Sequence, residues 1–280
     1  MNERDLRKSD LRESDLPECW TVNLGLIGYE RAWDLQQRIV AARKLALIPD
    51  VLLLCEHPHV ITMGRNGRAE HLLASEAVLR AKDVEFHATN RGGDITYHGP
   101  GQLVAYPILN LAEIRRDVGW YVRQLEEAMI RTTAEYGIVA ERREGRTGIW
   151  VDVTEANGSA TEEKLGAIGV HISRWVSSHG LAYNVATDLS YFDLIVPCGI
   201  AGKRATSLTR LVDREIKMSD AAPRLVRHLG NSFGRMMRVV SQAELEGALV
   251  AQEAPVNGGV RIARKLTEVT PRRDRRTSEL

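Results

Sequence analysis

Long apolar runs and cysteines are both scarce in this chain of 280 residues, and each scarcity excludes a class of protein. The longest apolar run, residues 51–55, is far shorter than the roughly 18 residues of a membrane-spanning helix. Three cysteines, without a CxxC pair, predict neither a disulfide framework nor a cysteine-rich zinc site. The charged first fifteen residues lack the apolar segment of a signal peptide, so we expect a cytoplasmic protein that does not enter the membrane.

A net positive charge is also lacking from most of the chain. The formal net charge is +1, but residues 261–280 alone carry seven basic and three acidic side chains. The preceding residues are therefore mildly acidic. A protein that binds nucleic acid carries its positive charge on the folded part, so we do not expect a nucleic-acid partner.

Apolar periodicity predicts a single α+β domain with helices flanking a mixed or antiparallel sheet. Helices are expected over residues 29–47 and 119–136 and again after residue 221, where Ser241 and Glu244 have capping-box spacing. The predicted strands are residues 51–55, 102–108, 137–140, 148–153, 165–172 and 181–185, with an exposed polar loop over 154–163. Pro107 indicates that its strand ends there or lies at an edge of the sheet. Strict alternation of strands and helices is absent, which argues against a parallel doubly wound sheet.

The ends of the chain differ in composition from its middle. We expect a charged leader over residues 1–18, a catalytic domain over 19–235 and a C-terminal extension with a basic tail over 236–280. Charged segments of this kind are usually solvated.

A glycine-rich segment, residues 91–102, reads RGGDITYHGPGQ. Its glycines permit the backbone to approach a ligand closely. It matches neither a phosphate-binding loop ending in GK[ST] nor a GxGxxG turn. The ordinary alternative is a glycine-rich turn between strands.

Two further segments hold candidate reactive groups. Residues 164–171 read KLGAIGVH, and strand alternation places Lys164, Gly166, Ile168 and Val170 on one face. Residues 196–203 read VPCGIAGK, so Cys198 lies close to a proline and two glycines, with the cations Lys203 and Arg204 nearby. Cations and backbone N–H groups favour a thiolate by lowering the pKa of the thiol. The alternatives are a solvated lysine at the start of a strand and an unreactive cysteine.

Histidines raise the question of a metal site. His57, His59, His98, His171 and His179 match no HExxH motif and no paired histidine–cysteine spacing. We therefore expect no metal centre.

Together these segments resemble the lipoyl(octanoyl) transferase family. RGGDITYHGPGQLVAYP, KLGAIGVHIS…HGLAYNV and PCGIAG occur in the family's order, and Glu56–Pro58 with Thr62–Arg65 is similar to a weaker upstream element. The resemblance covers residues 19–229. It implies the fold of biotin and lipoate protein ligases, an α+β domain around a mixed sheet.

The resemblance also implies an activity and its residues. An octanoyl group passes from octanoyl-acyl carrier protein to a lysine of a lipoyl domain, on the E2 subunit of a 2-oxoacid dehydrogenase or on the glycine cleavage H protein. Because the donor is already a thioester, no cofactor is needed. Cys198 corresponds to the acyl-thioester cysteine, and Lys164 to the lysine that lowers its pKa. Residues corresponding to the acyl-binding segments are Arg91, Gly92, Gly93, Asp94, Ile95, Thr96, Tyr97, His98, Ala167, Ile168, Gly169, Gly180, Leu181 and Ala182.

Three other functions remain open at this point. An ATP-dependent lipoate or biotin ligase would activate its acid as an adenylate, and an amidotransferase would move the acyl group between two lipoyl domains through a cysteine. A non-catalytic acyl-binding or lipoyl-domain-binding module would have no use for Cys198 and Lys164. Acidic partner proteins would require a basic patch near the site, for which Arg91, Arg174, Lys203 and Arg204 are candidates.

Overall fold

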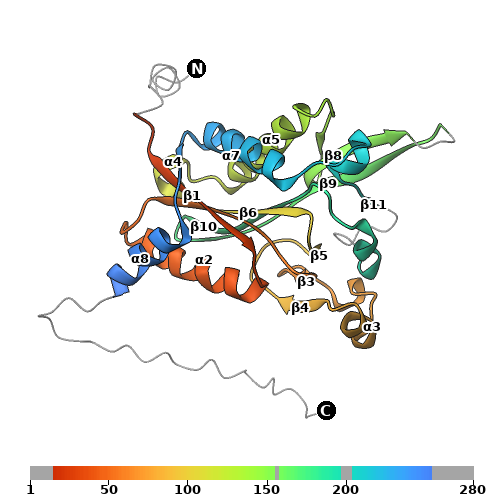
Figure 1. Ribbon diagram of the computed structural model, residues 1–280, viewed down its shortest axis with the longest axis horizontal. Coiled ribbons are helices and arrows are strands. Elements are labelled where there is room, and N and C mark those ends of the chain that lie inside the picture. Colours follow the sequence, from red (N-terminus) through yellow and green to blue (C-terminus); the bar gives the residue numbers. More distant parts are fainter. Residues whose placement is uncertain (1–14, 155–157, 197–203, 254–280) are drawn as a thin grey trace, which may run out of the picture.

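A nine-stranded mixed sheet forms the centre of the computed structural model (Figure 1), which describes residues 15–154, 158–196 and 204–253. Its order is β12-β1-β2-β6-β10-β9-β8-β7, and β11 pairs with β9. The strands are β1 (Glu18–Leu26), β2 (Asp50–Glu56), β6 (Gln102–Ile108), β7 (Glu141–Arg143), β8 (Arg146–Thr154), β9 (Ala160–Ser173), β10 (Val176–Asn184), β11 (Arg204–Ala205) and β12 (Met236–Val239). β1 runs parallel to β2 and β12, and β11 to β9, whereas the other pairs are antiparallel.

Helices cover both faces of this sheet (Figure 1). They are α2 (Tyr29–Lys44), α3 (Glu76–Ala81), α4 (Leu111–Ile114), α5 (Val118–Ala134), α6 (Leu208–Val212), α7 (Met218–Phe233) and α8 (Gln242–Glu253), with short 3₁₀ turns η2 (Ala69–His71) and η3 (Leu189–Leu194). Leu125 and Met129 of α5 pack with Leu225 of α7 in one core cluster. Ile39 of α2 and Leu245 of α8 belong to the cluster on the opposite face. The predicted α+β class is confirmed.

A small three-stranded sheet lies beside the large one and carries the glycine-rich segment. It has the order β4 (Glu85–Ala88), β3 (Val60–Met63), β5 (Ile95–His98). Ile61, Ile95 and Tyr97 form its buried core. Gly92 N–H donates to the Val170 carbonyl oxygen at 2.9 Å, so this small sheet is bonded directly to β9.

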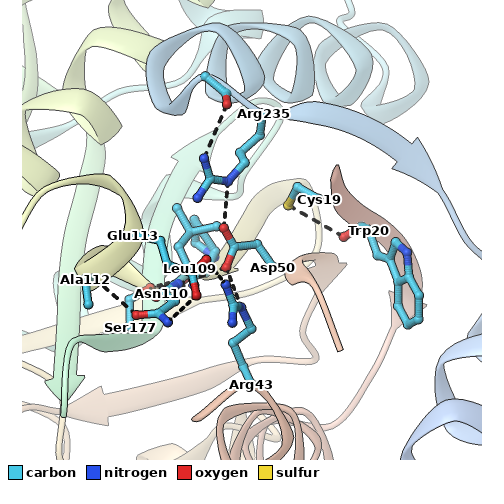
Figure 2. Close-up of polar contacts among 12 residues, drawn as sticks. Cys19, Trp20, Arg43, Asp50, Leu109, Asn110, Ala112, Glu113, Ser177 and Arg235 are labelled. Atoms are coloured by element: carbon cyan, nitrogen blue, oxygen red, sulfur yellow. Dashed lines mark hydrogen bonds and ion pairs between the residues drawn. The ribbon is translucent and has the colours of Figure 1, made fainter. Parts of the chain in front are cut away.

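A buried ion cluster centred on Asp50 joins four parts of the chain (Figure 2). Arg43 Nε donates to Asp50 Oδ1 at 2.8 Å and Arg235 Nε donates to Asp50 Oδ2 at 2.7 Å. The backbone N–H of Asn110 also donates to Asp50 Oδ1, at 2.8 Å, and Arg43 reaches Glu113 as well. The start of β2 is thereby bonded to the end of α2, to α4 and to the turn between α7 and β12.

Most of the predicted elements are present, and two predictions are wrong. Residues 137–140 form no strand; α5 ends before Gly137, whose φ of +77° turns the chain, and β7 begins only at Glu141. The predicted exposed loop over 154–163 is too long, because β9 already begins at Ala160 and pairing with β8 buries Glu163. The strands β1, β3, β4, β5 and β12 were not predicted. Pro107 lies next to the end of β6, as expected for a strand end, although β6 is in the interior of the sheet. The capping box is confirmed, because Glu244 N–H donates to Ser241 Oγ at 3.1 Å and Ser241 N–H to Glu244 Oε2 at 2.9 Å.

No helix in the described ranges is long and apolar enough to cross a membrane. The first fourteen residues of the predicted leader and the tail from residue 254 lie outside those ranges.

Candidate active site

A cavity of about 510 Å³ lies between the two sheets. Its volume is typical of sites for small organic ligands. Ala167 and Gly169 of β9, Gly180 and Ala182 of β10, and Val104 of β6 line one wall with small side chains. Residues of the glycine-rich segment line the opposite wall.

The structure brings most of the predicted binding residues to this cavity. Its lining includes Arg91, Gly93, Asp94, Ile95, Thr96, His98, Ala167, Ile168, Gly169, Gly180, Leu181 and Ala182, together with Lys164. Gly92 and Tyr97 are absent from that lining. Tyr97 is buried in the core of the small sheet, where its hydroxyl bonds to His59 Nδ1 at 2.7 Å.

An irregularity in β9 determines which way Lys164 faces. The pairing between β8 and β9 shifts between Ile149↔Gly166 and Trp150↔Lys164, so Leu165 is an extra residue in β9. A Cβ on Gly166 would meet Met129 Sδ at 2.6 Å, on the core side, whereas Lys164 lines the cavity with Ala167. The predicted common face for Lys164, Gly166, Ile168 and Val170 is therefore wrong, because a bulge breaks the alternation.

Gly148 leaves the space through which the Lys164 side chain passes. A Cβ there would lie 2.8 Å from Lys164 Cε and 2.3 Å from the Gly166 carbonyl oxygen. The φ of Gly148 is +109°, which other residues rarely adopt. Its N–H donates at 3.0 Å to Glu126 Oε1 on α5, which holds this part of β8 in place.

Cys198 and Lys203 lie outside the described residues, but both flanks of that segment reach the cavity. Val196 N–H donates to the carbonyl oxygen of His71 at 2.8 Å. On the other flank, β11 pairs with β9 so that Ala205 is opposite Lys164. His71 and Lys164 both line the cavity.

Arg91 closes the cavity from the side of the glycine-rich segment. It is buried, and its Nη2 donates to the Thr62 carbonyl oxygen at 2.6 Å and to Thr62 Oγ1 at 2.9 Å, while Nη1 donates to the Gly92 carbonyl oxygen at 3.1 Å. A Cβ on Gly169 would lie 2.9 Å from Arg91 Cδ. A glycine at 169 is therefore required by this close approach.

Three buried histidines near the cavity are uncharged at neutral pH. Burial lowers the pKa of His57 to about 4 and the pKa values of His98 and His179 to about 3. His98 Nδ1 bonds to Gln102 Oε1 at 2.7 Å, and His179 Nε2 to Asn90 Oδ1 at 2.7 Å. This arrangement fits side chains that shape a cavity better than groups that exchange protons.

The predicted basic patch needs a correction. Arg91 lines the cavity but is buried, and Arg174 lies in the β9–β10 turn, at the opposite end of β9 from Lys164. Arg204 is exposed on β11, next to Ala205, which is opposite Lys164. Arg68 and Arg146 also line the cavity. Three further residues that line the cavity, Tyr29, Trp150 and His71, were not predicted from the sequence. His71 Nδ1 lies 2.6 Å from Asp94 Oδ2.

No group of three or more histidine, cysteine or acidic side chains is placed to hold a metal ion in the part of the chain that the structure describes.

Comparison with known proteins agrees with this architecture. The family "Lipoyl protein ligase A/B catalytic domain" matches residues 28–230. An octanoyltransferase of Solibacter usitatus (strain Ellin6076) is 51% identical over 215 residues, which cover 77% of this chain and 93% of that protein. An octanoyltransferase of Chloroflexus aurantiacus (strain ATCC 29366 / DSM 635 / J-10-fl) is 48% identical over 221 residues, which cover 79% of this chain and 96% of that protein.

Solved structures share the fold at low sequence identity. A bipartite lipoate protein ligase from Thermoplasma acidophilum superposes with a TM-score of 0.64 and 15% identity, over 84% of this chain and 91% of that one. Lipoate-protein ligase A bound with ATP gives a TM-score of 0.64 and 16% identity, over 84% and 93% of the two chains. The predicted ligase-like fold is confirmed.

The fold thus defines a catalytic domain of the lipoyl protein ligase type. The sequence matches are more specific: the chain belongs to the lipoyl(octanoyl) transferase family and is an acyltransferase.

Proposed function

We propose that the enzyme takes its octanoyl group from octanoyl-acyl carrier protein, holds it as a thioester on Cys198, and passes it to a lysine of a lipoyl domain. The acceptors would be E2 subunits of 2-oxoacid dehydrogenases and the glycine cleavage H protein, and the reaction would take place in the cytoplasm. One structural relative, the ligase from T. acidophilum, is described together with its E2 lipoyl domain, which supports an acceptor of this kind.

The chemistry proceeds in two balanced steps. The Cys198 thiolate attacks the octanoyl carbonyl, the bond to the donor sulfur breaks, and that sulfur leaves with a proton. The acceptor amine then attacks the new thioester, an amide forms, and the Cys198 sulfur is released. Lys164 favours the Cys198 thiolate by its charge, delivers the proton to the donor sulfur and accepts one from the incoming amine.

One observation carries this proposal: both flanks of residues 197–203 are bonded to cavity residues. Cys198 is two residues from Val196, whose N–H bonds to the His71 carbonyl oxygen. Two residues of extended chain reach about 7 Å. The Lys164 backbone pairs with Ala205 on the other flank. Because residues on both sides of the segment that contains Cys198 are bonded to residues of the cavity, we propose that the acyl chain binds in this cavity.

The remaining cysteines do not compete for the role. Cys19 and Cys55 are 1% and 2% exposed, and burial raises the pKa of each thiol well above its usual range. A cysteine of this kind stays protonated and cannot reach a protein-bound thioester.

Intact-protein mass spectrometry after incubation with octanoyl-acyl carrier protein tests the proposal. We expect one octanoyl adduct that hydroxylamine removes. Cys198→Ala should abolish the adduct, and the matched variant Cys55→Ala should retain it. Lys164→Ala should slow formation of the adduct severely without unfolding the protein. An unmodified wild-type protein would refute the covalent mechanism.

Two further assays separate the alternatives. Pyrophosphate release from ATP with octanoate or lipoate would identify an ATP-dependent ligase. Faster acylation of Cys198 from an octanoylated lipoyl domain than from octanoyl-acyl carrier protein would identify an amidotransferase.

A further inference from the structure

Trp150 lies directly beside the side chain proposed to move protons. Trp150 on β8 is the cross-strand partner of Lys164 on β9. Lys164 Nζ is 5.0 Å from the centroid of the indole ring. Trp150 is only 1% exposed, and both residues line the cavity. This geometry falls within the range of a cation–π contact, which strengthens when the pair is shielded from water.

The position of the indole ring is itself fixed. Arg146 Cζ lies 5.2 Å from the ring centroid, and Arg146 Nη1 is held by Glu162 Oε2 at 2.7 Å. The indole Nε1 donates to the Arg146 carbonyl oxygen at 3.4 Å. The first residue of β8, Arg146, therefore helps to fix the ring that contacts Lys164.

The charges around the cavity make a contact with the ring favourable for a lysine. Arg68, Arg91 and Arg146 line the same cavity together with Asp94, so positive charges outnumber the negative one among its described lining residues and repel an ammonium group. A lysine side chain also has many rotamers, and few of them place Nζ where it could exchange protons in the proposed reaction. The negative face of an indole ring attracts the ammonium group.

From this geometry we infer that Trp150 is a positioning residue of the transferase, which holds Lys164 Nζ in place through its ring face. The inference depends on the proposed role of Lys164. It predicts that the electron density of the ring, and not only its shape, affects the rate of acyl transfer.

Site-specific replacement of Trp150 by tryptophans with one to four fluorine atoms tests the inference. Each fluorine withdraws electron density and changes the volume of the ring little. We expect the logarithm of the rate constant for acylation by octanoyl-acyl carrier protein to fall steadily with fluorine number, by roughly threefold to thirtyfold over the series. The donor concentration at half-saturation should stay constant. A rate constant independent of fluorine number would overturn the inference.

The same substitutions at Trp20 provide the matched control. Trp20 lies on β1, bonds to Glu18 and is absent from the cavity lining. Fluorination there should leave the rate constant unchanged. At position 150, Trp150→Phe should retain more activity than Trp150→Leu at equal thermal stability, because only phenylalanine keeps an aromatic face.

A second readout separates failure of this inference from failure of the proposed function. The rate of reductive methylation of Lys164, followed by peptide mass mapping, reports the environment of Nζ without any acyl transfer. We expect that rate to rise with fluorine number at Trp150. If the wild-type enzyme formed no octanoyl adduct, the proposed function would fail, and methylation rates would still decide whether the contact exists.

Discussion

A methyl group on Gly148 would lie 2.8 Å from Cε of Lys164, so the backbone of β8 limits where the lysine side chain can go. The same methyl group would also press against the Gly166 carbonyl oxygen of β9. The conformation of one glycine and the position of one cation are therefore coupled.

Gly148→Ala should consequently slow acyl transfer even when only folded enzyme is compared, in addition to destabilising the fold. We expect acyl transfer to fall at least about 100-fold, because a shift of about 1 Å in a reacting group has that effect. The measurement is the steady-state rate at equal concentrations of folded enzyme. Gly137→Ala is the control, since Gly137 has a similar positive φ of +77° but nothing within 4 Å of its Cβ position. Equal losses in the two variants would show that backbone strain alone is responsible.

Asp50→Ala should destabilise the whole domain. Removal of this carboxylate leaves the buried guanidinium groups of Arg43 and Arg235 without their shared partner. We expect the free energy of unfolding to fall by about 3–5 kcal/mol, as for other broken buried ion pairs. Urea denaturation measures the change, and Glu76→Ala, which removes an exposed pair with Arg80, should cost less than about 1 kcal/mol. Similar effects of the two variants would contradict a stabilising role for the cluster.

Stability should decline in mild acid because of the buried histidines. His57, His98 and His179 have pKa values lowered to about 4, 3 and 3, whereas unfolded histidine titrates near 6.5. At pH values between the folded and unfolded pKa values, the unfolded state binds more protons than the folded state. The stability contributed by the neutral histidines is therefore complete above pH 6.5 and is lost as the pH falls below it. We expect these three histidines to take up about three protons on unfolding at pH 5 and about two at pH 6 and at pH 4. His179→Gln should reduce that uptake by about one proton; an unchanged uptake would contradict the lowered pKa.

Glu135 should stabilise the contact between α5 and α7 until strongly acidic pH. Hydrogen bonds from Arg227, His228 and Arg224 lower the pKa of Glu135 to about 2. A carboxyl group with a lowered pKa contributes stability above its unfolded pKa and loses it as the pH falls toward the folded value. The stability difference between the wild type and Glu135→Gln should therefore persist at pH 5 and diminish as the pH falls toward 2. Urea titrations across that range measure it, and a pH-independent difference would refute the assignment.

Local signals in the sequence predicted much of the fold and several parts of the site. Three features could be predicted because each depends on residues close together in the sequence. They are the capping pair Ser241 and Glu244, the apolar face of α2 and the glycine-rich segment. The lysine- and glycine-bearing motifs likewise indicated segments that meet at the cavity.

Long-range pairing could not be predicted in the same way. The face of Lys164 depends on the bulge at Leu165, and this bulge follows from how β8 pairs with β9. Trp150 shows no unusual local pattern, and its importance arises only because pairing places it beside Lys164. Pro107 occupies an interior strand because its position near the end of β6 requires few backbone hydrogen bonds.

The pairing of β1 with β12 has a consequence for biosynthesis. Glu18 pairs with Met236, so β1 leaves the ribosome long before the strand that covers its outer edge. Until residues 236–239 emerge, a nascent chain exposes unpaired backbone groups of β1, a surface that promotes association with other chains. Pairing between strands so far apart in the sequence also slows folding.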